Sequence, residues 1–141
     1  MKSLIKKLCA AAAFFFVAKA ASAADISVSI NNTLGSTIGI QVTPTCNGAT
    51  CTWPSTIANG ATGSFNATFN SGITSAQLIF EYGKSDVRCR GNIRVDVDAS
   101  GNVTNVANTS WLRSWGTPTC SQLSGPTISG GDVVWSLRMG P

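Results

Sequence analysis

The sequence predicts an all-β fold, a small antiparallel β-sandwich (Ig-like or related) of about seven to eight strands stabilised by two disulfides. Three observations support this prediction. Apolar residues alternate with polar ones in several short runs, turn signals rich in Asn and Gly separate these runs, and four cysteines follow a predicted export signal. Alternation has the period of a half-buried strand, and the part of the chain after the signal holds no convincing helical stripe.

The strands are expected in order along the chain, each justified by its own alternation or apolar run. The predicted strands are 26–31, 38–43, 65–69, 76–82, 87–97, 103–106 and 133–137. The predicted turns between them are 32–35, 59–60, 70–72, 83–84, 100–102 and 130–131. Residues 108–131, rich in Gly, Pro, Ser and Thr, are expected to be irregular, with Cys120 joining them to the strand that holds Cys89.

Residues 1–23 are predicted to be a secretory signal peptide. A segment with three lysines precedes an apolar run over residues 8–18, and small residues then lead to a cleavage site near Ala23. The apolar run is shorter than the roughly 20 residues that a helix needs to cross a bilayer. We therefore expect a secreted or periplasmic protein, of bacterial type because the signal is compact, with residues 24–141 as a single β-sandwich domain.

Cleavage of this signal changes the charge of the protein. The whole chain has ten Lys and Arg against six Asp and Glu, and four of the lysines lie within residues 1–23. The six cations that remain balance the six acids. Nucleic-acid binding needs a clustered excess of Lys and Arg, so nucleic acid is not an expected partner.

Four cysteines remain after cleavage, and an even number in an oxidising compartment favours two disulfides. Of the three pairings that exist, we favour Cys46–Cys51 with Cys89–Cys120, because Asn47-Gly48 is a strong signal for a tight turn between the first two cysteines. The chain has no histidine and the cysteine spacing fits a zinc site poorly, so neither a metal nor a cofactor is expected.

The tryptophans are the first candidates for ligand binding. Trp135 alternates with apolar neighbours and is expected in the core. Trp111 and Trp115 flank Arg113 in the segment expected to be irregular, and Trp53 lies near the first disulfide. Loop tryptophans of this kind can stack on sugar rings or anchor a protein interface, and the alternative is that they close one end of the sandwich.

Arg88, Arg90 and Arg94 are a second, weaker candidate. Their spacing places them on one face of a strand, where guanidinium groups can bind a sulfate, phosphate or uronate. Asp96 and Asp98 are expected on the same face. The favoured alternative is therefore a soluble face on which the two signs of charge balance.

The segment from Asp96 to Asn102 resembles the start of an EF-hand calcium loop. Asp96, Asp98 and Ser100, with Asn102 following, supply oxygen atoms at a spacing that can surround a cation. Position twelve of such a loop would be Ala107, where a glutamate is expected. A β-hairpin with its tip at residues 99–102 is the favoured alternative.

Catalysis has little support, and we expect a non-catalytic protein. Without histidine there is no Ser-His or Cys-His pair, and Lys84 is the only lysine after the signal. The carboxylates of Asp96 and Asp98 are expected on the solvated face, where burial cannot tune their pKa values for glycoside hydrolysis.

Two families share features with the chain, and neither is assigned. The stretch from Val28 to Tyr82 resembles the opening of small β-sandwich lipid-binding cytolysins such as the aegerolysins, through an Asn-rich first hairpin and the turn at residues 56–62. This resemblance covers under half of the chain, and two disulfides do not belong to that pattern. Chaperone–usher pilins are similar in size and export, but residues 137–141 lack the aromatic expected near a pilin terminus.

The expected function is that of an exported binding protein whose loop aromatics recognise a glycan or a surface protein. One alternative is a structural subunit of a surface fibre or coat, in which strands 25–31 and 132–138 pair with a neighbouring subunit. Another is a small membrane-active or inhibitory effector. The sequence neither requires membrane contact nor indicates the oligomeric state.

Overall fold

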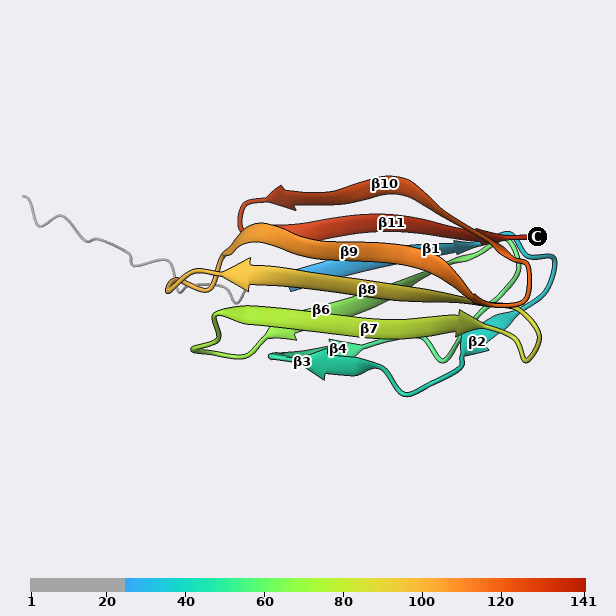
Figure 1. Cartoon of the computed structure of the whole chain (residues 1–141), viewed down its shortest axis with the longest axis horizontal. Helices are drawn as coiled ribbons and strands as arrows, with labels where there is room; N and C mark the ends of the chain where they lie inside the picture. The colour runs from blue at the N-terminus through green and yellow to red at the C-terminus, as the bar shows by residue number, and fades with distance from the viewer. Residues whose placement is uncertain (1–24) are drawn as a thin grey trace, which may run out of the picture.

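A computed structural model describes residues 25–141, in which eleven strands form two sheets packed face to face (Figure 1). The predicted signal peptide, residues 1–23, lies outside the described residues. The all-β sandwich is confirmed, with eleven strands in place of the seven or eight expected. Residues 25–141 contain no helix that is long and apolar enough to cross a membrane.

Sheet A is five-stranded, in the order β10-β11-β1-β6-β4. Its strands are β1 (Asp25–Asn32), β4 (Ala49–Thr52), β6 (Thr62–Phe69), β10 (Thr119–Ser129) and β11 (Asp132–Gly140). Sheet B is six-stranded, in the order β5-β2-β7-β8-β9, with β3 also paired to β7. Its strands are β2 (Ile38–Ile40), β3 (Thr45–Asn47), β5 (Thr56–Ile57), β7 (Ser75–Gly83), β8 (Arg88–Val97) and β9 (Val103–Trp115).

The centre of sheet A differs from the purely antiparallel arrangement that we expected. β1 and β11 pair in parallel, from Ile26 opposite Val133 to Asn32 opposite Met139. β6 covers the other edge of β1 and β10 covers the other edge of β11. Both strands therefore have their backbone groups paired within the sheet. The fibre-subunit alternative relied on these two strands being free to pair with a neighbour, and this premise is wrong.

The expectation that residues 108–131 are irregular is also wrong. They contribute most of β9 and β10, two of the longest strands in the described part of the chain. β10 is an edge strand with few buried side chains, so its sequence carries no apolar alternation. Its pairing with β11 shifts register twice, between Gln122 and Thr127, and Pro126 lies within this irregularity, where it interrupts no regular ladder.

The shorter strand β2 ends earlier than expected. Alternation predicted a strand over 38–43, but β2 ends at Ile40 and Val42 is 45% exposed beyond it. The chain turns here to form β3 and β4, which the sequence analysis missed because each spans only three or four residues. Gly48 joins them with a φ of 76°, which confirms the predicted tight turn at Asn47-Gly48.

The core between the sheets is centred on Phe80. Its ring lies 4.8 Å from Phe65, 6.0 Å from Trp111 and 6.4 Å from Trp135, measured between ring centroids. Gly91 of β8 is opposite Phe80 of β7, and a Cβ atom at Gly91 would overlap the Phe80 ring. The glycine thus makes the space into which this central aromatic packs.

Both predicted disulfides are confirmed, and each joins one sheet to the other. Cys46 of β3 is bonded to Cys51 of β4, and Cys89 of β8 is bonded to Cys120 of β10. The first lies on the β3/β4 side of the sandwich and the second on the β9/β10 side. Two such bonds indicate an oxidising compartment, such as the extracellular space or the periplasm.

Candidate functional site

The outer face of sheet B gathers several of the predicted site residues. Alternation along β8 buries Cys89, Ile93 and Val95 and turns the arginines away from the core. Arg88 lies opposite Trp115 of β9, and Arg90 lies opposite Leu112. Residues directly opposite each other share one face of a sheet. We call the surface formed by Arg88, Arg90, Arg94, Leu112 and Trp115 the β8–β9 face.

Two of these side chains expose large apolar areas. Trp115 is 62% exposed and Leu112 is 64% exposed. Trp115 reaches this face because β9 has an extra residue, Ser114, between the partners of Arg88 and Cys89. Without this bulge the alternation would place Trp115 on the same side as Trp111 and Arg113.

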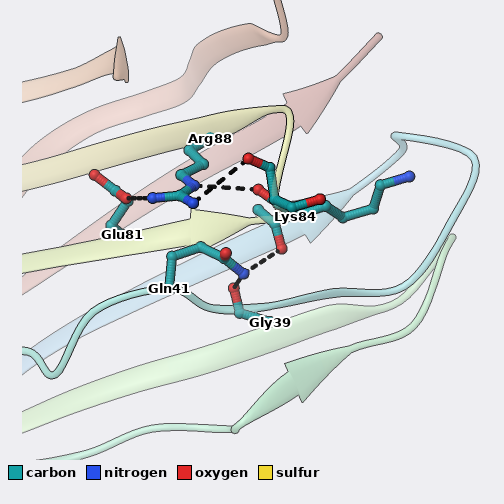
Figure 2. A network of polar contacts seen from close by, with 7 residues as sticks. Gly39, Gln41, Glu81, Lys84 and Arg88 are labelled. Atoms are coloured by element: carbon teal, nitrogen blue, oxygen red, sulfur yellow. Dashed lines mark hydrogen bonds and ion pairs between the residues drawn. The ribbon is translucent and has the colours of Figure 1, made fainter. Parts of the chain in front are cut away.

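Arg88 is held by the protein itself. One Nη atom lies 3.4 Å from Oε1 of Glu81, which is nearly buried on the neighbouring strand β7, as Figure 2 shows. Nε donates to the Lys84 carbonyl at 3.2 Å, and the other Nη donates to the Ser85 carbonyl at 3.4 Å. These bonds connect β8 to the turn that precedes it, so Arg88 has a structural role.

Gln41 holds the neighbouring part of the same network (Figure 2). Its Nε2 donates to the carbonyl of Gly39 at 3.0 Å and to that of Gly83 at 2.8 Å. The amide thus ties the end of β2 to the end of β7, and the network fixes the end of sheet B near Trp115.

Arg90 and Arg94 differ from Arg88, because the side chains of both are exposed to solvent. Within residues 25–141 neither guanidinium makes a side-chain hydrogen bond or an ion pair. The acids near them are occupied: Glu81 contacts Arg88, and Oδ2 of Asp96 accepts from Nδ2 of Asn105 at 2.9 Å. The predicted anion-binding arginines therefore divide into one structural residue and two free ones.

Trp111 is not the exposed loop residue that we expected. It lies in β9 opposite Gly91 and is only 2% exposed. Its ring packs near Phe80, and its Nε1 donates to the Arg138 carbonyl at 3.0 Å. The assignment of Trp111 to ligand binding is wrong, because the strand turns its side chain into the core, where its indole N–H is satisfied.

Arg113 and Trp53 lie apart from the β8–β9 face. Arg113 is opposite the buried Cys89, which places it on the other side of β9 from Leu112. Trp53 follows β4 at the opposite side of the sandwich, where its ring stacks on Phe65 at a centroid distance of 5.9 Å and stays 38% exposed. The structure therefore brings together Trp115 and the arginines, but neither Arg113 nor Trp53 with them.

The calcium candidate forms the hairpin tip that was the favoured alternative. Oδ1 of Asp98 accepts from the backbone amides of Ser100 and Asn102, each at 2.9 Å. The amide of Asn102, together with that of Ser100, holds the pKa of Asp98 below its ordinary value. These two hydrogen bonds close the turn. No group of three or more His, Cys, Asp or Glu in residues 25–141 is placed to hold a metal ion.

Leu112 is the residue of this face that the sequence analysis missed. The signal was present, because Trp111 and Leu112 are adjacent and must point to opposite faces if the segment is a strand. Because residues 108–131 were expected to be irregular, strand alternation was not applied to Trp111 and Leu112.

The fold is similar to that of a known protein. The chain superposes on the crystal structure of the lipid-binding protein Nakanori with a TM-score of 0.62, covering 84% of this chain and 71% of that chain at 11% sequence identity. Neither the protein-family models nor the curated proteins include a match to the sequence. At this identity the similarity establishes a shared fold.

Proposed function

We propose that this chain is an exported, non-catalytic protein that binds a glycan at the cell surface or outside the cell through its β8–β9 face. The observation that carries this proposal is Trp115, whose large ring is exposed on a strand face beside arginines. The folded chain gains little from this exposure. An exposed indole provides apolar area for the face of a sugar ring at low cost in conformational entropy.

The polar residues around Trp115 suit hydroxyl-rich ligands. The next outward pair along the two strands is Leu112 and Arg90, and the pair after that is Ser110 and Asn92. Oδ1 of Asn92 accepts from Nε2 of Gln77 at 3.2 Å. Nδ2 of Asn92 and the Ser110 hydroxyl can bond to sugar hydroxyls, while the indole and Leu112 contact the apolar edges of the sugar.

Two parts of this proposal, export and the non-catalytic role, are each supported by different observations. Export is supported by the signal predicted over residues 1–23 and by the two disulfides. A non-catalytic role is supported by the lack of histidine in the whole chain and by the carboxylates of Glu81, Asp96 and Asp98, which are engaged with other groups of the protein.

Lipid binding is the second candidate, favoured by the similarity in fold to a lipid-binding protein. Tryptophan is enriched at membrane interfaces, and Trp115 and Leu112 lie next to arginines that could contact phosphate groups. The apolar part of the face is small, however, because it consists of these two side chains.

A glycan array with a vesicle assay in parallel tests both candidates. The full chain is expressed in an oxidising secretory host, purified, and compared with Trp115→Ala and with Val134→Ala, which removes an exposed apolar side chain from sheet A. We expect Trp115→Ala to weaken glycan binding about tenfold or more, as for an interface anchor, and Val134→Ala to leave it unchanged. Binding to vesicles with no binding to any glycan would replace this proposal with the lipid candidate.

A further inference from the structure

We propose that the β8–β9 face selects acidic glycans, with Arg90 and Arg94 binding their sulfate or carboxylate groups. This inference rests on the glycan-binding function proposed above and specifies its ligand. It starts from the contrast between the three arginines of β8, of which one is held by the protein and two are not.

The charge of the face is uncompensated between Arg88 and Arg94. The acid that lies among these arginines is Glu81, which is opposite Arg90 in the register but contacts Arg88 at 3.4 Å. Asp96 lies beyond Arg94 at the hairpin end and accepts from Asn105. The guanidinium groups of Arg90 and Arg94 therefore have no hydrogen-bond or ion-pair partner among residues 25–141, and a guanidinium binds sulfate or carboxylate through paired N–H donors.

The spacing of the two free arginines fits an extended ligand. They are four residues apart on one face of β8, which corresponds to about 13 Å along the strand. Asn92 lies between them on the same face, and Leu112 and Ser110 lie alongside on β9. A polymer lying along the strands can present one anionic group to each arginine without either side chain having to bend toward the other.

The distribution of apolar residues favours a polysaccharide over a membrane as the source of these anions. Trp115 and Leu112 lie together at one end of the face, and the stretch from Asn92 to Arg94 pairs with Ser110 and Asn108. Other exposed apolar side chains, such as Val134 and Leu123, belong to sheet A. The apolar surface needed to enter a bilayer is therefore not continued along the row of arginines.

The test is calorimetric titration of the purified full chain with heparin and with polygalacturonate, and with dextran as a neutral polysaccharide. The double variant Arg90→Gln/Arg94→Gln is the probe of the face. Arg138→Gln is its matched control, because Arg138 is an exposed arginine on sheet A. We expect the acidic polymers to bind more tightly than dextran and the double variant to lose about 100-fold in affinity for them, corresponding to about tenfold for each charged contact. The control should stay within about twofold, and added salt should weaken binding of the original chain more than that of the double variant.

The possible failures point to different conclusions. Equal binding of dextran and the acidic polymers, with no effect of the double variant, would overturn the selection of anions and leave glycan binding intact if Trp115→Ala still weakens it. Absence of binding to all three polymers and to the array would remove both proposals. Binding to vesicles of anionic phospholipid, with no polysaccharide binding, would also overturn the inference and identify lipid as the source of the anions.

Discussion

The outer faces of the two sheets are built in opposite ways. On β1 and β6 of sheet A most of the outward side chains are uncharged, and several of them bond to one another across the two strands. Ser27 bonds to Asn66 at 2.9 Å, and Asn31 bonds to Thr62 at 3.1 Å. On sheet B the face carries arginines, acids and two exposed apolar side chains, and part of this set has no partner in the described residues.

This difference distinguishes polar groups that are hydrogen-bonded within the protein from polar groups that remain available to a ligand. Hydroxyls and amides that satisfy one another give β1 and β6 of sheet A a self-contained polar surface, whereas β11 of the same sheet carries the exposed Val134 and Arg138. On sheet B the pair of Arg88 and Glu81 is similarly self-contained, but Arg90, Arg94 and Trp115 are not. Such groups are free to bind a ligand, and on β8 and β9 two unengaged arginines lie together with an exposed tryptophan and leucine, which is why we place the candidate site on sheet B.

The largest expected effect compares the two tryptophans of β9. Trp111→Ala should lower the free energy of unfolding by about 3–5 kcal/mol, because it leaves a cavity beside Phe80. Trp115→Ala should change it by less than about 0.5 kcal/mol, because its side chain is mostly exposed. Chemical denaturation of both variants measures the difference. A large loss of stability from Trp115→Ala would mean that this ring supports the fold and is not free for a ligand.

The two disulfides, which join the sheets on opposite sides of the sandwich, are expected to contribute unequally to stability. Replacing Cys89 and Cys120 by serine should destabilise the protein by about 3.5 kcal/mol, and replacing Cys46 and Cys51 by about 2 kcal/mol, since the first bond closes the longer loop. Thermal unfolding of the two double variants measures both. The prediction is contradicted if removal of the short-loop bond costs more.

A smaller effect is expected from the polar pairs of the two faces. Glu81→Gln removes the partner of Arg88 and should cost about 0.5–1 kcal/mol, discounted because Arg88 is partly exposed. Ser29→Ala removes a hydroxyl bond to Ser136 on sheet A and should cost a similar amount. The cost on sheet B should shrink in high salt and that on sheet A should not. Unfolding at two salt concentrations distinguishes them, and equal salt responses would contradict this contrast.

The smallest effect is the pH dependence of the hairpin tip. The folded pKa of Asp98 is lowered by the amides of Asn102 and Ser100, so the ionised carboxylate stabilises the turn. This contribution is present above the unfolded pKa of about 3.9 and is lost as the pH falls through the lower folded value. The stability difference between the original chain and Asp98→Asn should therefore shrink as the pH falls below 4, as measured by thermal unfolding. A difference that stays constant with pH would show that the charge plays no part.

Much of the fold could be predicted from the sequence. Strands with one buried face, such as β1, β8 and β11, alternate clearly in sequence, and Asn47-Gly48 identified the first disulfide through its turn. β10 could not be predicted, since an exposed edge strand has no apolar period. The parallel pairing of β1 with β11 could not be predicted either, because partners so far apart in sequence leave no local signal.

The candidate site was predicted only in part. The arginines of β8 were placed on one face correctly, since their spacing fixes it. The division into a held Arg88 and free Arg90 and Arg94 depends on Glu81, which lies on a different strand and is buried against expectation for an acid. Trp115 lies on the same face as these arginines only because of the bulge at Ser114, and no sequence pattern predicts this bulge.

The central claim is that the outer face of sheet B, and not that of sheet A, binds the ligand. Titration of the isotope-labelled chain with a heparin-derived oligosaccharide, followed by NMR, tests it most directly. We predict shifts at the indole N–H of Trp115 and at the backbone amides of Leu112, Arg90 and Arg94, with none at Ser64 or Asn66 of β6. Shifts that concentrate on β1 and β6, with the Trp115 indole unchanged, would contradict the account.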